Sequence, residues 1–153
     1  MAKKKSFDAE KSQNPKYAKQ IVSLKPDSNN NLFPIWRFDM IDRDGPFAFQ
    51  YQSESFNHVE VLTKLIEYGN MTWGQIKKQT HDSSGKSKHH NLDVTKLKGD
   101  ALKRLKVKVE EEDYDSLFSF ALQNKLRIIG IVKKDEFHII WYDPEHKFFP
   151  SKK

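Results

Sequence analysis

Residues 126–132 read LRIIGIV and residues 137–142 read FHIIWY, with the polar stretch KKDE between them. Short runs rich in Ile, Val, Phe, Trp and Tyr are typical of β-strands, and a short polar link between two such runs is typical of an antiparallel turn. The near-continuous apolar character predicts that both strands are largely buried. The stretch from 125 to 141 therefore predicts an antiparallel strand pair within a small, soluble α+β domain.

A third strand is expected just before this pair, over residues 116–122 (SLFSFAL), which makes a C-terminal three-strand meander. We also expect an N-terminal hairpin. Residues 32–41 alternate well enough for a strand, the stretch DRDGP at 42–46 is rich in turn residues, and residues 47–51 (FAFQY) resemble a returning strand.

Helices are expected between the hairpin and the meander. The first follows a suitable N-cap, Asn57, and ends near Gly69, and a short second helix covers residues 73–79 after the cap residue Thr72. A third helix, over residues 95–108, has an apolar stripe on one face and lysines on the other. The predicted fold class is therefore α+β, with helices packed on an antiparallel sheet.

The chain of 153 residues fits a single domain. Residues 1–31 are rich in Lys, Ser, Asn and Gln and are expected to be a disordered or loosely docked basic tail, although a short apolar patch at 17–24 could dock on the body. The body then covers residues 32–150. The sequence has no membrane-length apolar run, no signal-peptide core and no cysteine, so we expect a cytoplasmic, bacterial protein without membrane contact.

The positive charge of the chain is unevenly distributed. The net charge is +6, but residues 1–25 alone hold seven Lys against Asp8 and Glu10, a balance of +5. Residues 77–108 hold nine Lys and one Arg against three Asp, a balance of +7, and five acidic residues follow at 110–115. The segment 77–108 therefore predicts a surface for anionic partners, with solvated helix faces as the alternative.

The polar corner after the last strand, Asp143-Pro144-Glu145-His146, is the first candidate site. Proline ends the strand ladder, and a carboxylate can orient an imidazole for catalysis. A structural Asp-Pro turn with an exposed histidine is the alternative.

The pair His89 and His90, next to Lys88, is the second candidate site. Neighbouring imidazoles can serve in acid–base chemistry. Metal binding together with His146 and Asp143 is disfavoured, because adjacent side chains on a strand diverge. Loop histidines without a special role are the third interpretation.

Arg127 is the third candidate, because it is a charge within a strand that is expected to be buried. A buried arginine needs a carboxylate or a phosphate, so pairing with Asp143 and phosphate binding both stay open. Gly130, nearby, would allow another backbone to approach closely. The three tryptophans, Trp36, Trp73 and Trp141, are expected to be core or rim aromatics, and Trp141 is the only one placed to stack on a base.

The stretch LRIIGI at 126–131, a short turn, and FHIIWYDPEHK at 137–147 together resemble the last two strands and the terminal histidine segment of RelE/ParE-like bacterial toxins. The resemblance covers roughly residues 93–149. The same pattern, with its Trp-x-Asp-Pro-x-His end, is also similar to that of small bacterial proteins to which no activity is attached. The N-terminal hairpin, the basic tail and the Asp143-Pro144 pair depart from the toxin pattern.

RelE-type toxins are endoribonucleases that cleave without a metal or other cofactor. The resemblance implies RNA or another nucleic acid as substrate, an antitoxin or other protein as partner, and charge-stabilising and acid–base roles for Arg127 and His146. The expected catalytic set is His146, Arg127, His89 and Asp143. The expected nucleic-acid-binding set is Lys88, His90, Lys103, Arg104, Lys106 and Trp141. The alternatives are a non-catalytic nucleic-acid-binding module of phage or mobile-element origin, and a protein-interaction adaptor.

Overall fold

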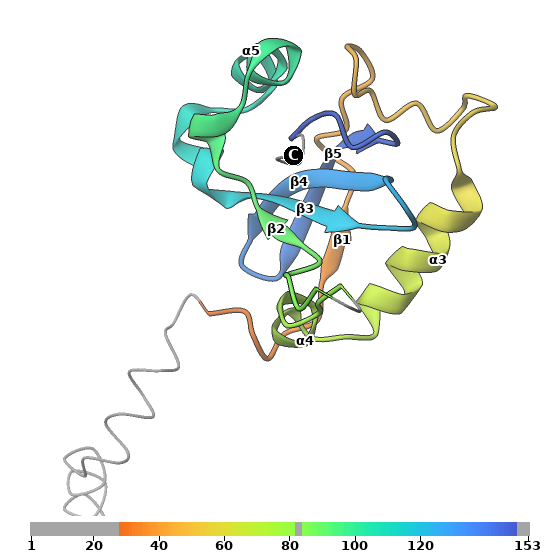
Figure 1. Cartoon of the computed structure of the whole chain (residues 1–153), viewed down its shortest axis with the longest axis vertical. Coiled ribbons are helices and arrows are strands. Elements are labelled where there is room, and N and C mark those ends of the chain that lie inside the picture. The colour runs from red at the N-terminus through yellow and green to blue at the C-terminus, as the bar shows by residue number, and fades with distance from the viewer. Residues whose placement is uncertain (1–27, 82–83, 150–153) are drawn as a thin grey trace, which may run out of the picture.

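The computed structural model describes residues 28–81 and 84–149 of the chain (Figure 1). Its centre is a five-stranded sheet with the strand order β1-β5-β4-β3-β2. All neighbouring strands are antiparallel except β1 and β5, which are parallel. The strands are β1 (Ile35–Arg37), β2 (His90–Asn91), β3 (Leu117–Ala121), β4 (Arg127–Lys133) and β5 (Glu136–Asp143). The predicted α+β class and the C-terminal meander are confirmed.

Three α-helices and two 3-10 helices complete the described fold: α3 (His58–Gly69), α4 (Trp73–Lys77), α5 (Gly99–Lys108), η1 (Val94–Lys96) and η2 (Glu111–Ser116). The predicted caps are confirmed, because the Asn57 side chain accepts a hydrogen bond from the Glu60 N–H and Thr72 forms a capping box with Gln75. The helix expected from Thr95 begins only at Gly99. The reason is local: Asp93 accepts a hydrogen bond from the Thr95 N–H and so starts a separate 3-10 turn.

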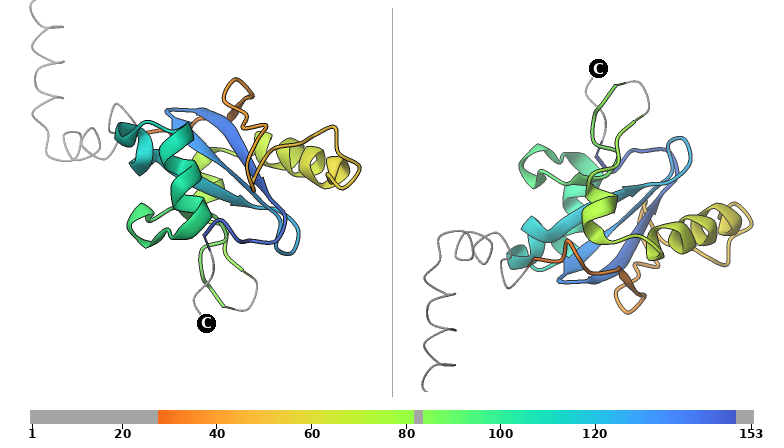
Figure 2. Two further views of the ribbon diagram at one scale, coloured as in Figure 1. Left: turned by 90° about the horizontal axis from the view of Figure 1, so that it is seen from above. Right: turned by 90° about the horizontal axis from the view of Figure 1, so that it is seen from below.

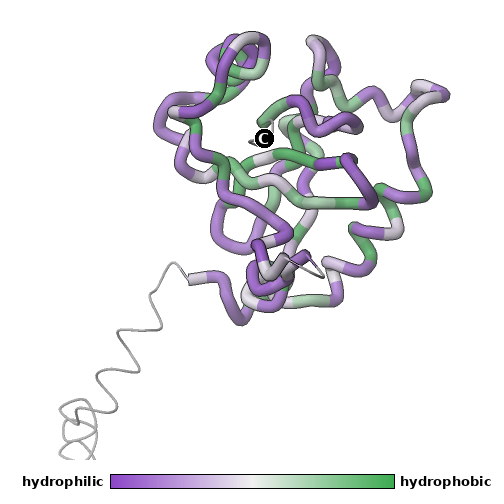
Figure 3. The backbone as a smooth tube through the Cα atoms, viewed as in Figure 1, coloured by the Kyte–Doolittle hydropathy of each residue, from purple (hydrophilic) through white to green (hydrophobic). Residues whose placement is uncertain are grey.

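The sheet buries a separate apolar core on each face, with α3 on one side and α5 on the other (Figure 2). Alternation along the strands explains this, because Phe118, Phe120 and Ile128 enter the α3 core while Leu117 and Ile129 enter the α5 core. The inner strands are accordingly hydrophobic along most of their length (Figure 3). Among the described residues, no helix has the length and apolar character that a membrane span requires.

The expected N-terminal hairpin is wrong. β1 pairs in parallel with the first half of β5, and residues 47–51 form no strand beyond an isolated bridge between Ala48 and Trp141. The loop over 42–49 instead follows the second half of β5, where Asp42 N–H donates to the Ile140 carbonyl and Tyr142 N–H to the Phe47 carbonyl. The segment pairs with β5 rather than with itself because the backbone groups at that strand edge need partners.

Gly130 lies at a β-bulge between β4 and β5. A Cβ atom there would stand 2.1 Å from the carbonyl oxygen of His138, so only glycine permits this approach. The predicted close backbone contact is confirmed. Of the basic tail expected over residues 1–31, positions 1–27 lie outside the described residues. Asn29, within the last four positions of that stretch, is buried and donates a 2.7 Å hydrogen bond to the Lys134 carbonyl.

Candidate functional site

Strand register gathers three polar side chains at one end of the sheet, where β3 leads into β4 (Figure 1). Arg127 lies opposite both Ala121 on β3 and Asp143 on β5, and His90 on β2 lies opposite Ser119. Directly opposed residues, and residues two apart on a strand, project from the same face of a sheet. His90, Arg127 and Asp143 therefore emerge on the α5 face at the same end.

The segment after β5 folds back over this face and brings His146 to the same end. Phe148 is buried against Trp141 and Phe47, with ring centroids 4.7 and 4.9 Å apart. The carboxylate of Asp143 fixes the corner, because it accepts hydrogen bonds from the N–H groups of Lys147 (2.9 Å) and Phe148 (2.8 Å). His146 adopts a left-handed backbone conformation, with φ 54°, within this corner. The Asp-Pro turn is thus structural, and its histidine is half-buried beside the other two basic groups.

Arg127 is the centre of the cluster and has an unusual hydrogen-bond set. The residue is only 9% exposed, and its Nη1 donates to the carbonyls of Asn124 (2.8 Å) and Leu126 (2.9 Å). Asp143 attracts the guanidinium but uses its oxygens on backbone N–H groups. No buried side-chain nitrogen among the described residues lacks a partner, so the remaining guanidinium nitrogens of Arg127 reach solvent. An arginine in this state has donors available for an anion.

Two imidazoles lie close enough to the guanidinium for its charge to act on them. The pKa of His90 is lowered by burial first and then by the positive charges of Arg127 and His81. The pKa of His146 is lowered by burial, Arg127 and His90, against an opposing effect of Asp143. Both shifts favour the neutral form of the imidazole. We call the set His90, Arg127, Asp143 and His146 the basic cluster.

His89 is not part of this cluster, contrary to the sequence-based prediction of a catalytic role. It points to the opposite face, where it is 5% exposed and packs against Tyr68 and Phe120. Its Nδ1 accepts a hydrogen bond from the Ala121 N–H (3.0 Å), so its Nε2–H donates to Gln79 Oε1 (2.7 Å). Burial and nearby positive charges lower its pKa to about 3. His89 is a neutral core histidine.

Arg104 and Trp141 were predicted to contact nucleic acid, and the structure gives both of them a partner inside the protein. Trp141 is fully buried and donates from Nε1 to Asp42 Oδ2 (2.9 Å), so no base can stack on it. Arg104 binds both carboxylate oxygens of Asp42 at 2.7 Å. Burial would raise the pKa of Asp42, but hydrogen bonds from Arg104, the Asp44 N–H and Trp141 together lower it. Both residues stabilise a closed network around a buried carboxylate.

The remaining predicted contacts are lysines. Lys103 and Lys106 are exposed on α5, and no hydrogen bond or ion pair within the described part of the chain joins them to the basic cluster. Lys88 is half-buried just before β2, close enough for its charge to lower the pKa of His89. Of the basic segment 77–108, the structure therefore brings the β2 end, with His90, to His146 and Arg127.

Sequence reasoning missed Tyr68 and Asn124. The Tyr68 hydroxyl is buried and donates to the Ala121 carbonyl (2.5 Å), and its pKa is raised, chiefly by burial. Asn124 has a positive φ of 56° and offers its carbonyl to Arg127. The β-turn position of Asn124 was visible in the sequence, since asparagine tolerates this conformation. The contact of Tyr68 depends on tertiary packing and has no local signal.

The chemistry of the site follows from its residue types. Within residues 28–81 and 84–149, no group of three or more His, Cys, Asp or Glu side chains is arranged to hold a metal ion. The basic cluster instead combines a guanidinium with two imidazoles, which suits a phosphate oxygen and proton transfer beside it. Comparison of the chain with protein-family models, curated proteins and solved structures finds no match. The resemblance to RelE/ParE-like toxins stays a prediction.

Proposed function

We propose that the protein is a toxin-like endoribonuclease that binds an RNA phosphodiester at the basic cluster and cleaves it without a metal. The observation that carries this proposal is the Arg127 guanidinium, which binds two carbonyls through Nη1 alone and lies close enough to His90 and His146 for its charge to act on both imidazoles. Arg127 would bind the non-bridging phosphate oxygens and stabilise the charge that develops on them. This is the role that the resemblance to RelE-like toxins implies for Arg127.

His90 and His146 would move the protons. One imidazole, unprotonated, accepts the proton of the ribose 2′-hydroxyl as its oxygen attacks phosphorus. The other, protonated, donates a proton to the 5′-oxygen as the P–O5′ bond breaks. The products are a 2′,3′-cyclic phosphate and a 5′-hydroxyl. Asp143 contributes indirectly, because its hydrogen bonds to the backbone after His146 hold the corner in position.

The test is a cleavage assay on end-labelled single-stranded RNA with and without EDTA. We expect cleavage that survives EDTA, leaves a 2′,3′-cyclic phosphate, and spares a DNA strand of the same sequence, since DNA lacks the attacking hydroxyl. His146→Ala, His90→Ala and Arg127→Gln should each reduce the rate about 100-fold or more. Arg37→Gln removes a half-exposed arginine on β1 and serves as the matched control. No cleavage by folded protein, or equal loss in the control, would contradict the proposal.

A second function, non-catalytic nucleic-acid binding, is favoured by one observation. Lys103 and Lys106 are exposed on α5 within the segment whose balance is +7. Phosphate contacts of this kind give affinity that falls steeply with salt, without strand scission. The double variant Lys103→Ala/Lys106→Ala should flatten the salt dependence of binding by about two ion equivalents if this face carries the function.

A further inference from the structure

The outward face of α3 has an apolar stripe that nothing in the described structure covers. Val59, Leu62 and Ile66 follow the spacing i, i+3, i+7 and are 78%, 60% and 57% exposed. The opposite face of the same helix is buried through Val61 and Tyr68. A surface helix normally has one apolar face and one polar face. A helix that is apolar on both sides has a second surface prepared for a partner.

A groove continues this stripe toward the loop after β1. It has a volume of about 540 Å³, within the range of binding pockets, and its walls include Phe38, Ile41, Phe49, Phe56, Leu62 and Leu65. Phe38 is 52% exposed, although its ring is among the largest apolar groups on this surface. The stripe and the groove share Leu62, so they form one continuous apolar surface, which we call the α3 groove.

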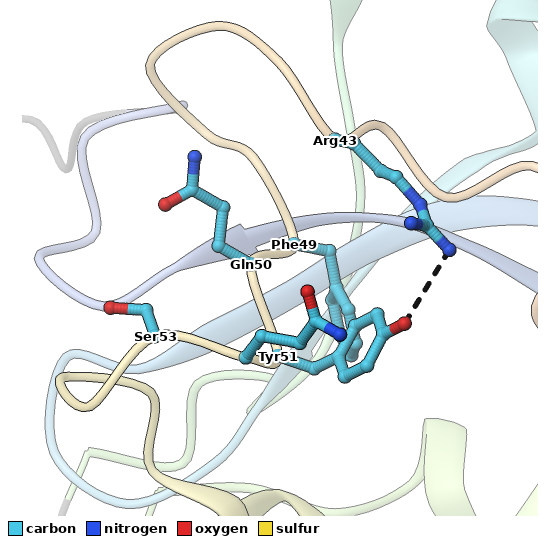
Figure 4. A pocket seen from close by; sticks show the side chains of 6 residues that line it. Arg43, Phe49, Gln50, Tyr51 and Ser53 are labelled. Carbon is cyan, nitrogen blue, oxygen red and sulfur yellow. Dashed lines mark hydrogen bonds between the residues drawn. The ribbon is translucent and has the colours of Figure 1, made fainter.

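The cavity of the α3 groove has one arginine in its lining. Arg43 lines it, and within the described part of the chain no carboxylate does. Among the described residues, only Tyr51 holds the Arg43 guanidinium, through a 3.5 Å hydrogen bond to the hydroxyl and a position 5.6 Å from the ring centroid. Figure 4 shows this pair at a neighbouring hollow of about 390 Å³, which shares Arg43, Phe49 and Tyr51 with the groove. A carboxylate at the border of the groove would therefore meet an available guanidinium.

We propose that the α3 groove binds an acidic amphipathic helix of a partner protein. Apolar side chains at helical spacing would fill the groove and cover the stripe, and an Asp or Glu on the border of that helix would pair with Arg43. The apolar surface extends beyond the cavity to Val59 and Ile66, which fits a helix better than a small molecule. The chain's own residues 1–25 have a balance of +5, the same sign as Arg43, so they do not complement this surface.

This inference is independent of the proposed nuclease. The residues that line the groove are all different from those of the basic cluster, and α3 lies against the other face of the sheet from α5 (Figure 2). Arg127→Gln should therefore leave partner binding unchanged, and Leu62→Asp should leave RNA cleavage unchanged. Either proposal can fail while the other holds.

The experiment uses the full chain as bait for a displayed library of random peptides of about 16 residues, roughly four helical turns. Enriched peptides are synthesised, and their affinities are measured by fluorescence anisotropy. We expect Leu, Ile or Phe at i, i+3 and i+7, with Asp or Glu beside them. Leu62→Asp and Arg43→Glu should each weaken binding about tenfold or more. Val107→Asp, at an exposed apolar residue of α5, is the matched control and should change the affinity less than about twofold.

A charge swap makes the test sharper. A peptide whose acidic residue is changed to Lys should bind Arg43→Glu better than it binds the unaltered protein. The proposal is overturned if no peptide is enriched, if Leu62→Asp binds the peptides normally, or if Arg43→Glu has no effect. A dimer that Leu62→Asp dissociates would assign the groove to a second copy of the chain. Protection of residues 17–24 from hydrogen exchange that Leu62→Asp removes would assign it to the chain's own N-terminal segment.

Discussion

Arg104 and Arg127 both bring a guanidinium to the α5 side of the sheet, but their surroundings differ. Arg104 meets a carboxylate that is 2% exposed and binds both of its oxygens. Arg127 meets two backbone carbonyls, while the carboxylate opposite it in the sheet is engaged by backbone N–H groups. One guanidinium is satisfied by its protein partners, and the other keeps donors that reach solvent.

This contrast shows how a fold separates a structural charge from a charge that is available to a ligand. A buried ion pair in which both carboxylate oxygens are bound is costly to break, and neither oxygen is available to a ligand. A buried arginine bound only to carbonyls keeps its full charge and part of its donor set. The decisive element is the diversion of Asp143 to the N–H groups of Lys147 and Phe148.

Breaking the closed network should have the largest effect on stability. Arg104→Leu leaves the buried carboxylate of Asp42 without its cation, and we expect it to lower the free energy of unfolding more than Arg127→Gln does. Urea denaturation measures this change. The double variant Asp42→Asn/Arg104→Leu should recover part of the loss, because no buried charge is then left unpaired. A single variant that is as stable as the unaltered protein would show that Arg104 is dispensable for the fold.

Arg127→Gln should change stability little but reduce RNA cleavage strongly. Because the guanidinium binds only carbonyls, its replacement by an amide that can still donate a hydrogen bond should change the free energy of unfolding by about 1 kcal/mol or less. RNA cleavage should nevertheless fall about 100-fold or more. Parallel urea denaturation and cleavage assays test both parts. A large stability loss with unchanged cleavage would place Arg127 in the same class as Arg104.

The buried His89 offers a further test of the contrast between structural groups and groups available to a ligand. His89 has a pKa of about 3 in the fold and an ordinary value of 6.5 when unfolded, so the unfolded state binds more protons between these pH values. Above about pH 6.5, protonation of His89 therefore takes nothing from the free energy of unfolding. Below that pH the free energy of unfolding falls as the pH falls toward 3, and the loss at pH 5 is about 2 kcal/mol.

His89→Asn keeps an acceptor for the Ala121 N–H but does not titrate in this range. Its stability should therefore depend less on pH than that of the unaltered protein when urea denaturation is compared at pH 7 and pH 5. Parallel pH dependences in the two proteins would mean that His89 binds its proton as readily in the folded state as in the unfolded state.

The smallest expected effect is on the pKa values of the two histidines in the basic cluster. Arg127 lowers the pKa of both His90 and His146, so Arg127→Gln should raise both values toward 6.5. Proton NMR of the imidazole C–H resonances between pH 4 and pH 8 measures the shift. If Arg127→Gln leaves His90 and His146 unchanged, the three groups do not act as one cluster.

The sequence predicted the parts of the fold that local pattern determines. The continuous apolar strands at 117–121, 127–133 and 136–143 and the caps Asn57 and Thr72 are examples. The hairpin was wrong because alternation at 35–37 identifies a strand but not its partner, and the edge of β5 was the better partner. Register between strands is a tertiary property that local pattern leaves open.

The candidate site was predicted in part for the same reason. Arg127, Asp143, His90 and His146 were all identified in the sequence as candidate site residues, and antiparallel register brings the first three to one end of the sheet. His89 was misassigned because neighbouring strand residues face opposite sides of the sheet. The closed network could not be foreseen, because Asp42 lies in a stretch whose composition is that of an exposed turn, yet it is buried between Arg104 and Trp141.

The proposed nuclease activity requires the basic cluster to bind a phosphodiester. The most direct measurement is an NMR titration of the protein with a dinucleotide that lacks the 2′-hydroxyl at the scissile position and so cannot be cleaved. We expect the imidazole resonances of His90 and His146 and the Nε–H of Arg127 to shift together along one binding curve, while His89 and the Nε–H of Arg104 stay in place. Shifts confined to Lys103, Lys106 and their neighbours on α5, with His90 and His146 unmoved, would contradict it.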